Sequence, residues 1–305
     1  MNVFNVIRDT LYSGDPLVRT WFLVESNYLP FVSSIVYVLF VKKVGPALMK
    51  NRKPFELRNL MIVYNFFVVF AYAGSLLFLF SLPFWTPALE KICEPAVITK
   101  DNWTYLVANV AWVIYALKYL EFADTIFFVL RKKSRLITNL HVIHHAALPI
   151  IAWVFMRTET SGFQFFPAGL NSFIHIIMYT YYGLAAMGPE VRKYLWWKEY
   201  LTQLQMLQFV IIISFVTVIV PLSGCQTTQH GIYIEIIAAI IFLALFCNFY
   251  IQTYKKKPLK QNVELQNSKS HSHSNGNSNS SGNDQNDHRN QFGISNGVNG
   301  ELRKR

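Results

Sequence analysis

The sequence contains seven apolar runs that are each long enough to cross the roughly 30 Å hydrocarbon core of a bilayer. These runs fall near residues 28–47, 59–81, 104–130, 139–157, 166–188, 200–222 and 231–253. Hydrophobic residues make up 52% of the 305 residues and charged residues only 15%, a balance too apolar for an ordinary soluble domain. The pattern therefore predicts an all-α polytopic membrane protein with seven transmembrane helices.

Lysine and arginine gather in alternate loops between these runs. Basic clusters follow the first, third and seventh runs, within residues 42–58, 131–135 and 255–260. Cytosolic loops of membrane proteins are enriched in Lys and Arg, so we expect these clusters in the cytosol and the amino terminus in the lumen. The clusters account for the net charge of +11, and no basic face with interleaved aromatic residues indicates a nucleic-acid partner.

Charge and composition together divide the chain into three parts. Residues 1–27 are expected to form a luminal segment, residues 28–254 a seven-helix membrane domain, and residues 255–305 a cytosolic tail. From about residue 262 the tail is rich in Asn, Ser and Gly and holds almost no large apolar residue. Such a segment cannot bury enough surface to offset its ordering entropy, so we expect it to be largely disordered.

The expected luminal loops carry residues suited to covalent modification. Asn102 begins an Asn-Trp-Thr tripeptide, which is an N-glycosylation acceptor, just before the third run. Cys93 and Cys225 also fall in luminal loops, where an oxidising compartment permits a disulfide; the alternative is two unpaired thiols. Cys247 lies within the seventh run and is expected to be a small buried hydrophobic residue.

Three histidines occur within five residues where the fourth run begins. Helical spacing places His141, His144 and His145 on one face, because residues three and four apart are neighbours on a helix. Ionisable side chains inside a membrane helix are costly and indicate a functional site by default. These histidines therefore predict a site inside the bundle, in its cytosolic half.

The third run carries charged residues at the same helical spacing. Lys118, Glu121 and Asp124 lie three residues apart, and each would cost about 2.5 to 3.5 kcal/mol facing lipid at the bilayer centre. They are therefore expected to face the interior of the bundle. Lys118 and Glu121 are spaced for an ion pair, whereas Asp124 has no cation at its own spacing and is available to orient a histidine.

Two further runs add polar stripes on the cytosolic side. The fifth run carries a stripe of five residues at separations of three and four, namely Asn171, His175, Met178, Tyr179 and Tyr182. The sixth run begins with a stripe of hydroxyl and amide side chains, namely Thr202, Gln205 and Gln208. Hydrogen bonding between helices is the structural alternative for the sixth run.

Four polar stripes above an apolar luminal half suit a substrate with a charged, water-soluble handle and an apolar tail, and an acyl-CoA has this form. A metal-dependent lipid enzyme is one alternative, since a zinc ion takes three or four such ligands. A seven-span receptor or transporter is another, with the histidines as a proton relay. Without a metal, a neutral buried imidazole could attack a thioester and form an acyl-imidazole, because no cysteine lies near the polar stripes.

Four motifs in this order resemble those of the very-long-chain fatty acid elongases of the endoplasmic reticulum, and the resemblance covers roughly residues 25 to 255. The motifs are Lys118-x-x-Glu121-x-x-Asp124-Thr125, His141-x-x-His144-His145, His175-x-x-Met178-Tyr179-x-Tyr181-Tyr182 and Thr202-x-x-Gln205-x-x-Gln208. The resemblance implies the first step of elongation, in which acyl-CoA and malonyl-CoA give 3-ketoacyl-CoA, carbon dioxide and CoA. It also implies residence in the reticulum membrane and no cofactor or metal beyond these substrates.

Carried over residue by residue, the resemblance makes His144 the nucleophile that holds the acyl group. His175 would serve the malonyl half, as an acid-base group or as a stabiliser of the enolate. His141, His145 and Asp124 would orient and tune these rings. The expected substrate-binding residues are Lys118, Glu121, Asn171, Tyr179, Gln205 and Gln208. The expected partners are long-chain acyl-CoA, malonyl-CoA and membrane lipids, and the resemblance is compatible with a homo-oligomer and with the reductases and dehydratase of the cycle.

Overall fold

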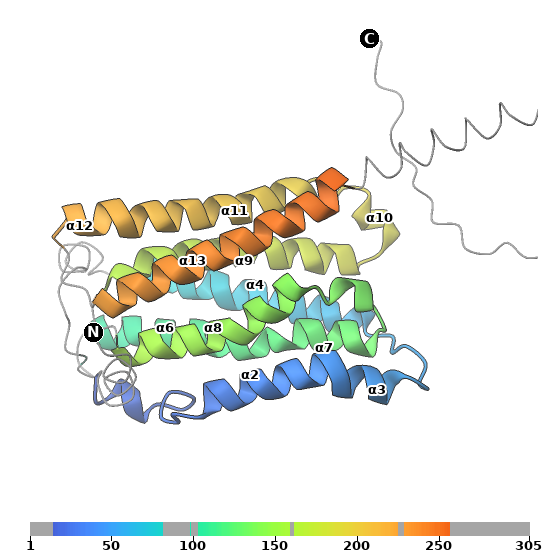
Figure 1. Ribbon diagram of the computed structural model, residues 1–305, viewed down its shortest axis with the longest axis horizontal. Helices are drawn as coiled ribbons and strands as arrows, with labels where there is room; N and C mark the ends of the chain where they lie inside the picture. The colour runs from blue at the N-terminus through green and yellow to red at the C-terminus, as the bar shows by residue number, and fades with distance from the viewer. Residues whose placement is uncertain (1–14, 82–97, 99–102, 159–161, 225–228, 257–305) are drawn as a thin grey trace, which may run out of the picture. The chain divides into compact units, whose positions relative to one another are not determined.

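A computed structural model of the chain describes residues 15–81, 98, 103–158, 162–224 and 229–256 (Figure 1). Within these residues every regular element is a helix, so the all-α prediction is confirmed for the described part of the chain. The chain divides into a unit over Met1–Lys256 and a second unit over Lys257–Arg305. The second unit, with nearly all of the predicted tail, lies outside the described residues.

The first membrane helix is built from three consecutive pieces: α2 (Leu29–Leu39), the π-helix η2 (Phe40–Val44) and α3 (Gly45–Met49). Gly45 lets this helix approach α7 (Phe122–Leu130) closely. A Cβ at Gly45 would lie 2.7 Å from Cγ1 of Val129, which is closer than carbon atoms pack. Any larger residue at this position would therefore push the two helices apart.

The third predicted run forms two nearly continuous helices, α6 (Trp103–Leu120) and α7. They meet at Glu121, where backbone hydrogen bonds bridge the junction: the N–H of Glu121 donates to the carbonyl of Leu117, and the N–H of Asp124 donates to that of Glu121. The path of the helix thus continues through a tighter turn at Glu121. This turn lies within the predicted charged stripe.

The remaining long helices complete the bundle: α4 (Arg58–Ser81), α8 (Asn139–Thr158), α9 (Phe165–Ala186), α11 (Lys198–Ser214) and α13 (Gln229–Tyr250). α11 continues into the π-helix η5 (Phe215–Ile219) and α12 (Val220–Leu222), and α13 continues into the π-helix η6 (Ile251–Lys255). The short helices are η1 (Val18–Thr20), η3 (Ser134–Leu136), η4 (Gly162–Gln164) and α10 (Pro189–Arg192). In the bundle α4 packs against α9, α11 against α13, and both α2 and α6 against α8.

Five helical segments in the described ranges are long and apolar enough to cross a membrane. They are Leu29–Met49, Arg58–Ser81, Asn139–Thr158, Lys198–Leu222 and Gly231–Lys255, and they match five of the seven predicted runs. The other two runs form α6 with α7, and α9, whose charged and polar side chains lower their mean hydropathy. These helices are consistent with the predicted polytopic membrane fold, and the count of seven spans stays a prediction.

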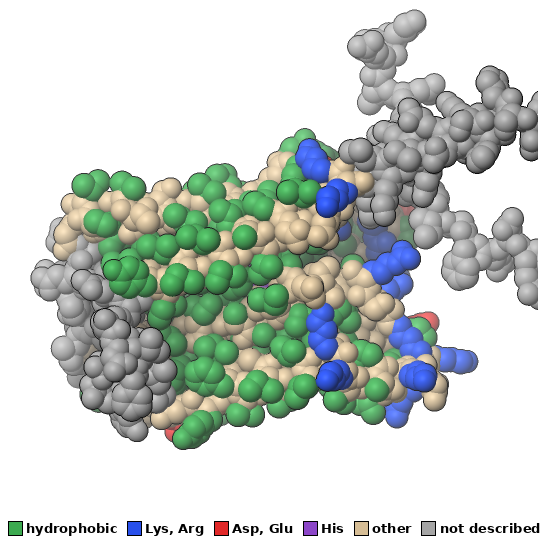
Figure 2. Space-filling model, viewed as in Figure 1, with side chains coloured by type: hydrophobic (Ala, Val, Ile, Leu, Met, Phe, Trp, Pro, Cys, Tyr) green, Lys and Arg blue, Asp and Glu red, His purple; other side chains and the backbone are tan. Residues whose placement is uncertain are grey.

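The bundle surface is apolar along its length and basic at one end. Figure 2 shows green apolar side chains over the middle of the bundle and Lys and Arg gathered at the end where α10 lies in Figure 1. On α4, Phe67, Phe70 and Leu77 are 58%, 72% and 69% exposed. Exposed apolar area of this extent marks a surface that contacts lipid or another partner rather than water.

The predicted modification sites fall outside the described residues. Cys93, Cys225 and Asn102 all lie there, so the disulfide and the glycosylation stay predictions. Cys247 is a free thiol on α13, with its Sγ 3.7 Å from Sδ of Met206. It is only partly buried, which corrects the expectation of a buried residue: it lies on a helix that itself is in large part exposed.

Candidate active site

The helix α8 presents three imidazole rings on one face, as predicted. The ring centroids of His141 and His145 lie 4.3 Å apart, and those of His144 and His145 lie 5.2 Å apart. Pro149 lies one turn further along α8 and has no N–H, so the carbonyl of His145 receives no helical hydrogen bond from it. The cluster thus lies beside a point where the helix lacks one backbone hydrogen bond.

His144 lies between the histidine cluster and an apolar part of the bundle. Its ring centroid is 5.0 Å from that of Phe242 and 6.3 Å from that of Phe246, both on α13. Phe242 belongs to a buried apolar cluster that also contains Phe209 and Ile212 of α11. An uncharged imidazole suits such surroundings, because removing a charge from water is costly.

Glu121 is the centre of the polar cluster, and its side chain is fully buried. Its Oε1 accepts a hydrogen bond from the Tyr72 hydroxyl at 2.5 Å, and it lies 3.0 Å from Nδ1 of His175. Its Oε2 faces Nδ1 of His145 at 4.0 Å. One carboxylate therefore lies between His145 of α8 and His175 of α9.

The predicted ion pair between Lys118 and Glu121 is confirmed, with Nζ and Oε1 3.5 Å apart. The ammonium of Lys118 is also buried, and it donates to the Tyr72 hydroxyl at 2.8 Å and to Oδ1 of Asn171 at 3.2 Å. A buried ion pair is tolerated only where further hydrogen bonds satisfy its charges. Tyr72 and Asn171 supply those bonds here.

Asp124 also faces a histidine, as predicted, but at a longer distance. Its Oδ2 lies 3.9 Å from Nε2 of His145, which is longer than a hydrogen bond. The same oxygen accepts a hydrogen bond from the Tyr179 hydroxyl at 2.7 Å. The next residue, Thr125, shares a 2.7 Å hydrogen bond with the Tyr37 hydroxyl of α2. The structure thus joins Asp124 to α9 directly and its neighbour to α2.

Three of these residues form a group that could hold a metal ion. Ligand atoms of Asp124, His141 and His145 all lie within 4.8 Å of one another. Nε2 of His141 and Nδ1 of His145 have no hydrogen-bond partner among the described residues. Three protein ligands are the number that a catalytic zinc site uses, so the metal alternative fits the geometry of α8. His175 and His144 are not part of this group.

The stripe on α9 points mostly inward. His175, Met178 and Tyr179 are buried, whereas Tyr182 is 36% exposed. The expectation that Tyr182 faces inward is therefore wrong: it lies in the last turns of α9, near the end of the bundle, and Tyr181 is buried instead.

Within the described residues, the hydrogen bonds of the stripe on α11 go to groups other than the histidines. Nε2 of Gln205 donates to Sδ of Met178 at 3.3 Å, and Thr202 donates to the carbonyl of Lys198 at 3.3 Å. Gln208 is 3% exposed, and its Oε1 has no hydrogen-bond partner within the described part of the chain. Buried polar atoms are nearly always bonded, so this oxygen is a candidate contact for a bound molecule.

Two tyrosines of the site were not predicted. Tyr72 of α4 and Tyr37 of α2 lie in runs from which no site residue was expected. The sequence holds 16 tyrosines, and a tyrosine in an apolar run is usually a packing residue with its hydroxyl satisfied. The only available signal was that a buried hydroxyl needs a partner, which does not say which partner.

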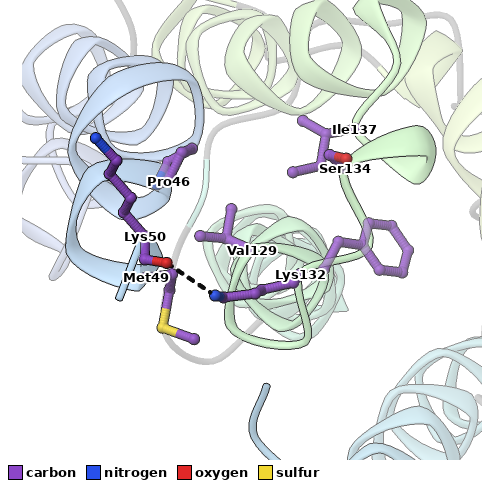
Figure 3. Close-up of a pocket in the computed structure, with 8 residues that line it drawn as sticks. Pro46, Met49, Lys50, Val129, Lys132, Ser134 and Ile137 are labelled. Carbon is purple, nitrogen blue, oxygen red and sulfur yellow. Dashed lines mark hydrogen bonds between the residues drawn. The ribbon is translucent and has the colours of Figure 1, made fainter. Parts of the chain in front are cut away.

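A separate pocket of about 220 Å³ opens between α3 and α7, away from the polar cluster (Figure 3). It is lined by Pro46, Met49, Lys50, Phe128, Val129, Lys132, Ser134 and Ile137. Nζ of Lys132 donates to the carbonyl of Lys50 at 3.1 Å and so ties the two helix ends together. None of the predicted site residues lines this pocket, but the ring of Phe128 lies 5.5 Å from that of His141.

Comparison with known proteins gives consistent matches over most of the chain. The profile described as ELO, the GNS1/SUR4 family, matches residues 22–262. Very long chain fatty acid elongase 7 of Rattus norvegicus is 38% identical over 260 residues, which cover 84% of this chain and 92% of that protein. Elongase 5 of Rattus norvegicus is 41% identical over 262 residues, or 84% of each chain. Elongase 1 of Homo sapiens is 36% identical over 267 residues, or 85% of this chain and 95% of that protein.

Proposed function

This chain belongs to the GNS1/SUR4 (ELO) family, and from that premise we propose that it is a 3-oxoacyl-CoA synthase that condenses a long-chain acyl-CoA with malonyl-CoA. The names of its relatives support elongation of very long chain fatty acids. The observation that carries the proposal is one buried carboxylate, Glu121, between His145 of α8 and His175 of α9, with His144 beside an apolar cluster. Such a site can handle a polar thioester and an apolar tail together.

In the acyl half of the reaction, a nitrogen lone pair of His144 attacks the thioester carbonyl of acyl-CoA. A C–N bond forms, the C–S bond breaks, and CoA leaves as a thiolate that takes up a proton. The product is an acyl-imidazole, a covalent intermediate that divides one difficult step into two. The position of His144 beside Phe242 supports this role, because the acyl chain would leave the carbonyl toward apolar side chains.

In the malonyl half, malonyl-CoA loses carbon dioxide and becomes an enolate. The enolate carbon attacks the acyl carbonyl, so that a C–C bond forms and the bond to His144 breaks. The products are 3-ketoacyl-CoA, carbon dioxide and the imidazolate of His144, which takes up a proton from water and becomes neutral imidazole again. The enolate needs hydrogen-bond donors that are already in place. The surroundings of His175 support this role, since Oε1 of Glu121 lies 3.0 Å from its Nδ1 and the ring centroid of Tyr179 lies 5.8 Å from its own.

Both halves use only the substrates and the side chains of this chain, so the proposal includes no cofactor and no metal. The partners are long-chain acyl-CoA, malonyl-CoA and membrane lipids. Association with the reductases and dehydratase that process a 3-ketoacyl-CoA, and with a second copy of the chain, is also proposed.

The proposed topology has seven spans, with the amino terminus in the lumen of the endoplasmic reticulum and the carboxyl terminus in the cytosol. The five apolar helices support it, with α6, α7 and α9 packed among them in the same bundle. The basic end of the bundle supports the orientation, since the positive-inside rule places it in the cytosol (Figure 2).

The test is the incorporation of labelled malonyl-CoA by membranes that contain this chain or its His144→Ala variant, over a panel of acyl-CoA lengths. The proposal predicts products two carbons longer with the wild type and none with the variant. Hydroxylamine should release acyl groups that are covalently bound to the wild type, and it should release none from the variant. This result would support the acyl-imidazole intermediate. Failure of folded wild-type protein to extend any acyl-CoA would overturn the proposal.

A further inference from the structure

The helix α4 contributes one residue to the centre of the polar cluster. Tyr72 is fully buried where α4 packs against α9, in a cluster that also contains Val68, Leu117 and Met178. Its ring centroid lies 5.1 Å from that of His175. Its hydroxyl makes its hydrogen bonds within the polar cluster, with Glu121 and Lys118.

The hydroxyl of Tyr72 both donates and accepts a hydrogen bond. It donates to Oε1 of Glu121 at 2.5 Å and accepts from Nζ of Lys118 at 2.8 Å. The direct distance from Lys118 Nζ to the same Oε1 is longer, at 3.5 Å. Tyr72 therefore stands between the ammonium and the carboxylate, and it makes the shortest hydrogen bond that Glu121 receives within the described residues.

The same carboxylate oxygen governs His175. It lies 3.0 Å from Nδ1, and although this contact lacks the angle of a hydrogen bond, a carboxylate so close repels a lone pair and favours the tautomer with the proton on Nδ1. Nε2 of His175 then carries the lone pair, so it accepts a proton in the reaction and donates one only after it has been protonated. A displacement of Oε1 would release both the tautomer and the orientation of the ring.

We infer that Tyr72 is a positioning residue for the malonyl half of the reaction: it fixes Glu121, and Glu121 orients His175. The inference rests on the proposed function, since it assigns His175 to the step that consumes malonyl-CoA. Without the hydroxyl, Lys118 would be free to move onto Oε1 and draw the carboxylate away from His175. Tyr72 itself touches no reacting atom in this scheme.

The experiment separates the two halves. Release of CoA from acyl-CoA alone reports the acyl half, and formation of 3-ketoacyl-CoA reports both. Tyr72→Phe should lower the turnover number for condensation by about 10- to 100-fold, the range for loss of a hydrogen bond to a charged group. CoA release should stay within about twofold of wild type, which is the change expected from about 0.4 kcal/mol. A tyrosine with only a structural role would slow both halves or neither.

The matched control is Tyr115→Phe. Tyr115 is also buried, and its hydroxyl donates to the carbonyl of Leu23 at 3.0 Å. Leu23 is not a residue of the polar cluster. This variant removes one buried tyrosine hydroxyl without touching Glu121, so both halves should keep their wild-type rates.

Double substitution supplies a second, independent test. If Tyr72 acts through Glu121, then Tyr72→Phe with Glu121→Gln should condense no more slowly than Glu121→Gln alone, because interacting residues are not additive. If the double variant condensed more slowly than Glu121→Gln by the full factor lost in Tyr72→Phe, the inference would be overturned. Equal loss of CoA release and condensation in Tyr72→Phe would also overturn it. If wild-type protein condenses but releases no CoA from acyl-CoA alone, the double variant decides the inference.

Two outcomes keep this inference separate from the proposed function and from misfolding. Folded wild type that extends no acyl-CoA refutes the function rather than the role of Tyr72. If Tyr72→Phe does not fold, 3-fluorotyrosine at position 72 keeps the hydroxyl and nearly the same size but changes its strength as a donor. It should alter the rate of condensation and leave CoA release unchanged; unchanged condensation would overturn the inference.

Discussion

Oε1 of Glu121 lies 3.0 Å from Nδ1 of His175, so a carboxylate at the junction of α6 and α7 meets an imidazole of α9 in the centre of the bundle. The same carboxylate faces His145 of α8 with its other oxygen. One carboxylate at the junction of α6 and α7 thus contacts histidines of both α8 and α9. Several expectations follow from how that charge is balanced.

The pair Lys118 and Glu121 should be coupled in stability. Glu121→Gln leaves a buried ammonium without its counter-charge, and breaking a buried ion pair in this way typically costs about 3–5 kcal/mol. Lys118→Met leaves the carboxylate unpaired at similar cost. The double variant removes both charges, so its thermal unfolding midpoint in detergent should lie above that of either single variant. If the loss of midpoint in the double variant equalled the sum of the losses in the two single variants, the pairing seen here would be contradicted.

Phe242 should matter to both packing and the acyl half. It is 5% exposed and touches the ring of His144, so Phe242→Ala should cost about 3–5 kcal/mol and slow CoA release from acyl-CoA. Phe70→Ala on α4 is the matched control, because Phe70 is 72% exposed on the lipid-facing surface. Its unfolding midpoint and rates should stay near those of wild type. Equal effects of the two variants would contradict the role of Phe242.

The metal alternative makes a different prediction from the proposed condensation. If Asp124, His141 and His145 hold an ion, purified protein should carry about one zinc per chain, and chelation should abolish activity. The proposal that uses only imidazole chemistry predicts a metal content well below one per chain and activity that survives chelation. Elemental analysis of wild type and His141→Ala separates the two, since an ion held by this group would be lost in the variant.

The helices could be predicted from the length of the apolar runs, and the inward stripes from the spacing of polar residues by three and four. Lys118, Glu121 and Asp124 recur every three residues, and the structure buries all three. Which carboxylate meets which histidine could not be predicted, because it depends on how far each helix is rotated. The expectation that Asp124 would orient a histidine holds only loosely, at 3.9 Å, whereas Glu121 lies 3.0 Å from His175. Tyr72 was missed because its role depends on the packing of α4 on α9 and not on any motif.

Gln208 should show a trade between stability and activity. It is buried on α11 with no partner for its Oε1 in the described part of the chain, so Gln208→Leu removes an unsatisfied polar group and should raise the unfolding midpoint. If the oxygen serves a substrate, the same variant should raise KM for one CoA substrate by about fivefold, the equivalent of about 1 kcal/mol.

Gln203 on the same helix provides the control for Gln208. Its Nε2 donates to the hydroxyl of Tyr250 at 2.9 Å, so its polar group is satisfied within the protein. Gln203→Leu should therefore lower the unfolding midpoint and leave both KM values unchanged, the opposite pattern to Gln208→Leu. A lower midpoint for Gln208→Leu with unchanged KM would mean that its amide serves packing between helices, as polar side chains in membrane bundles often do. The two variants thus distinguish a residue held ready for substrate from one that joins α11 to α13.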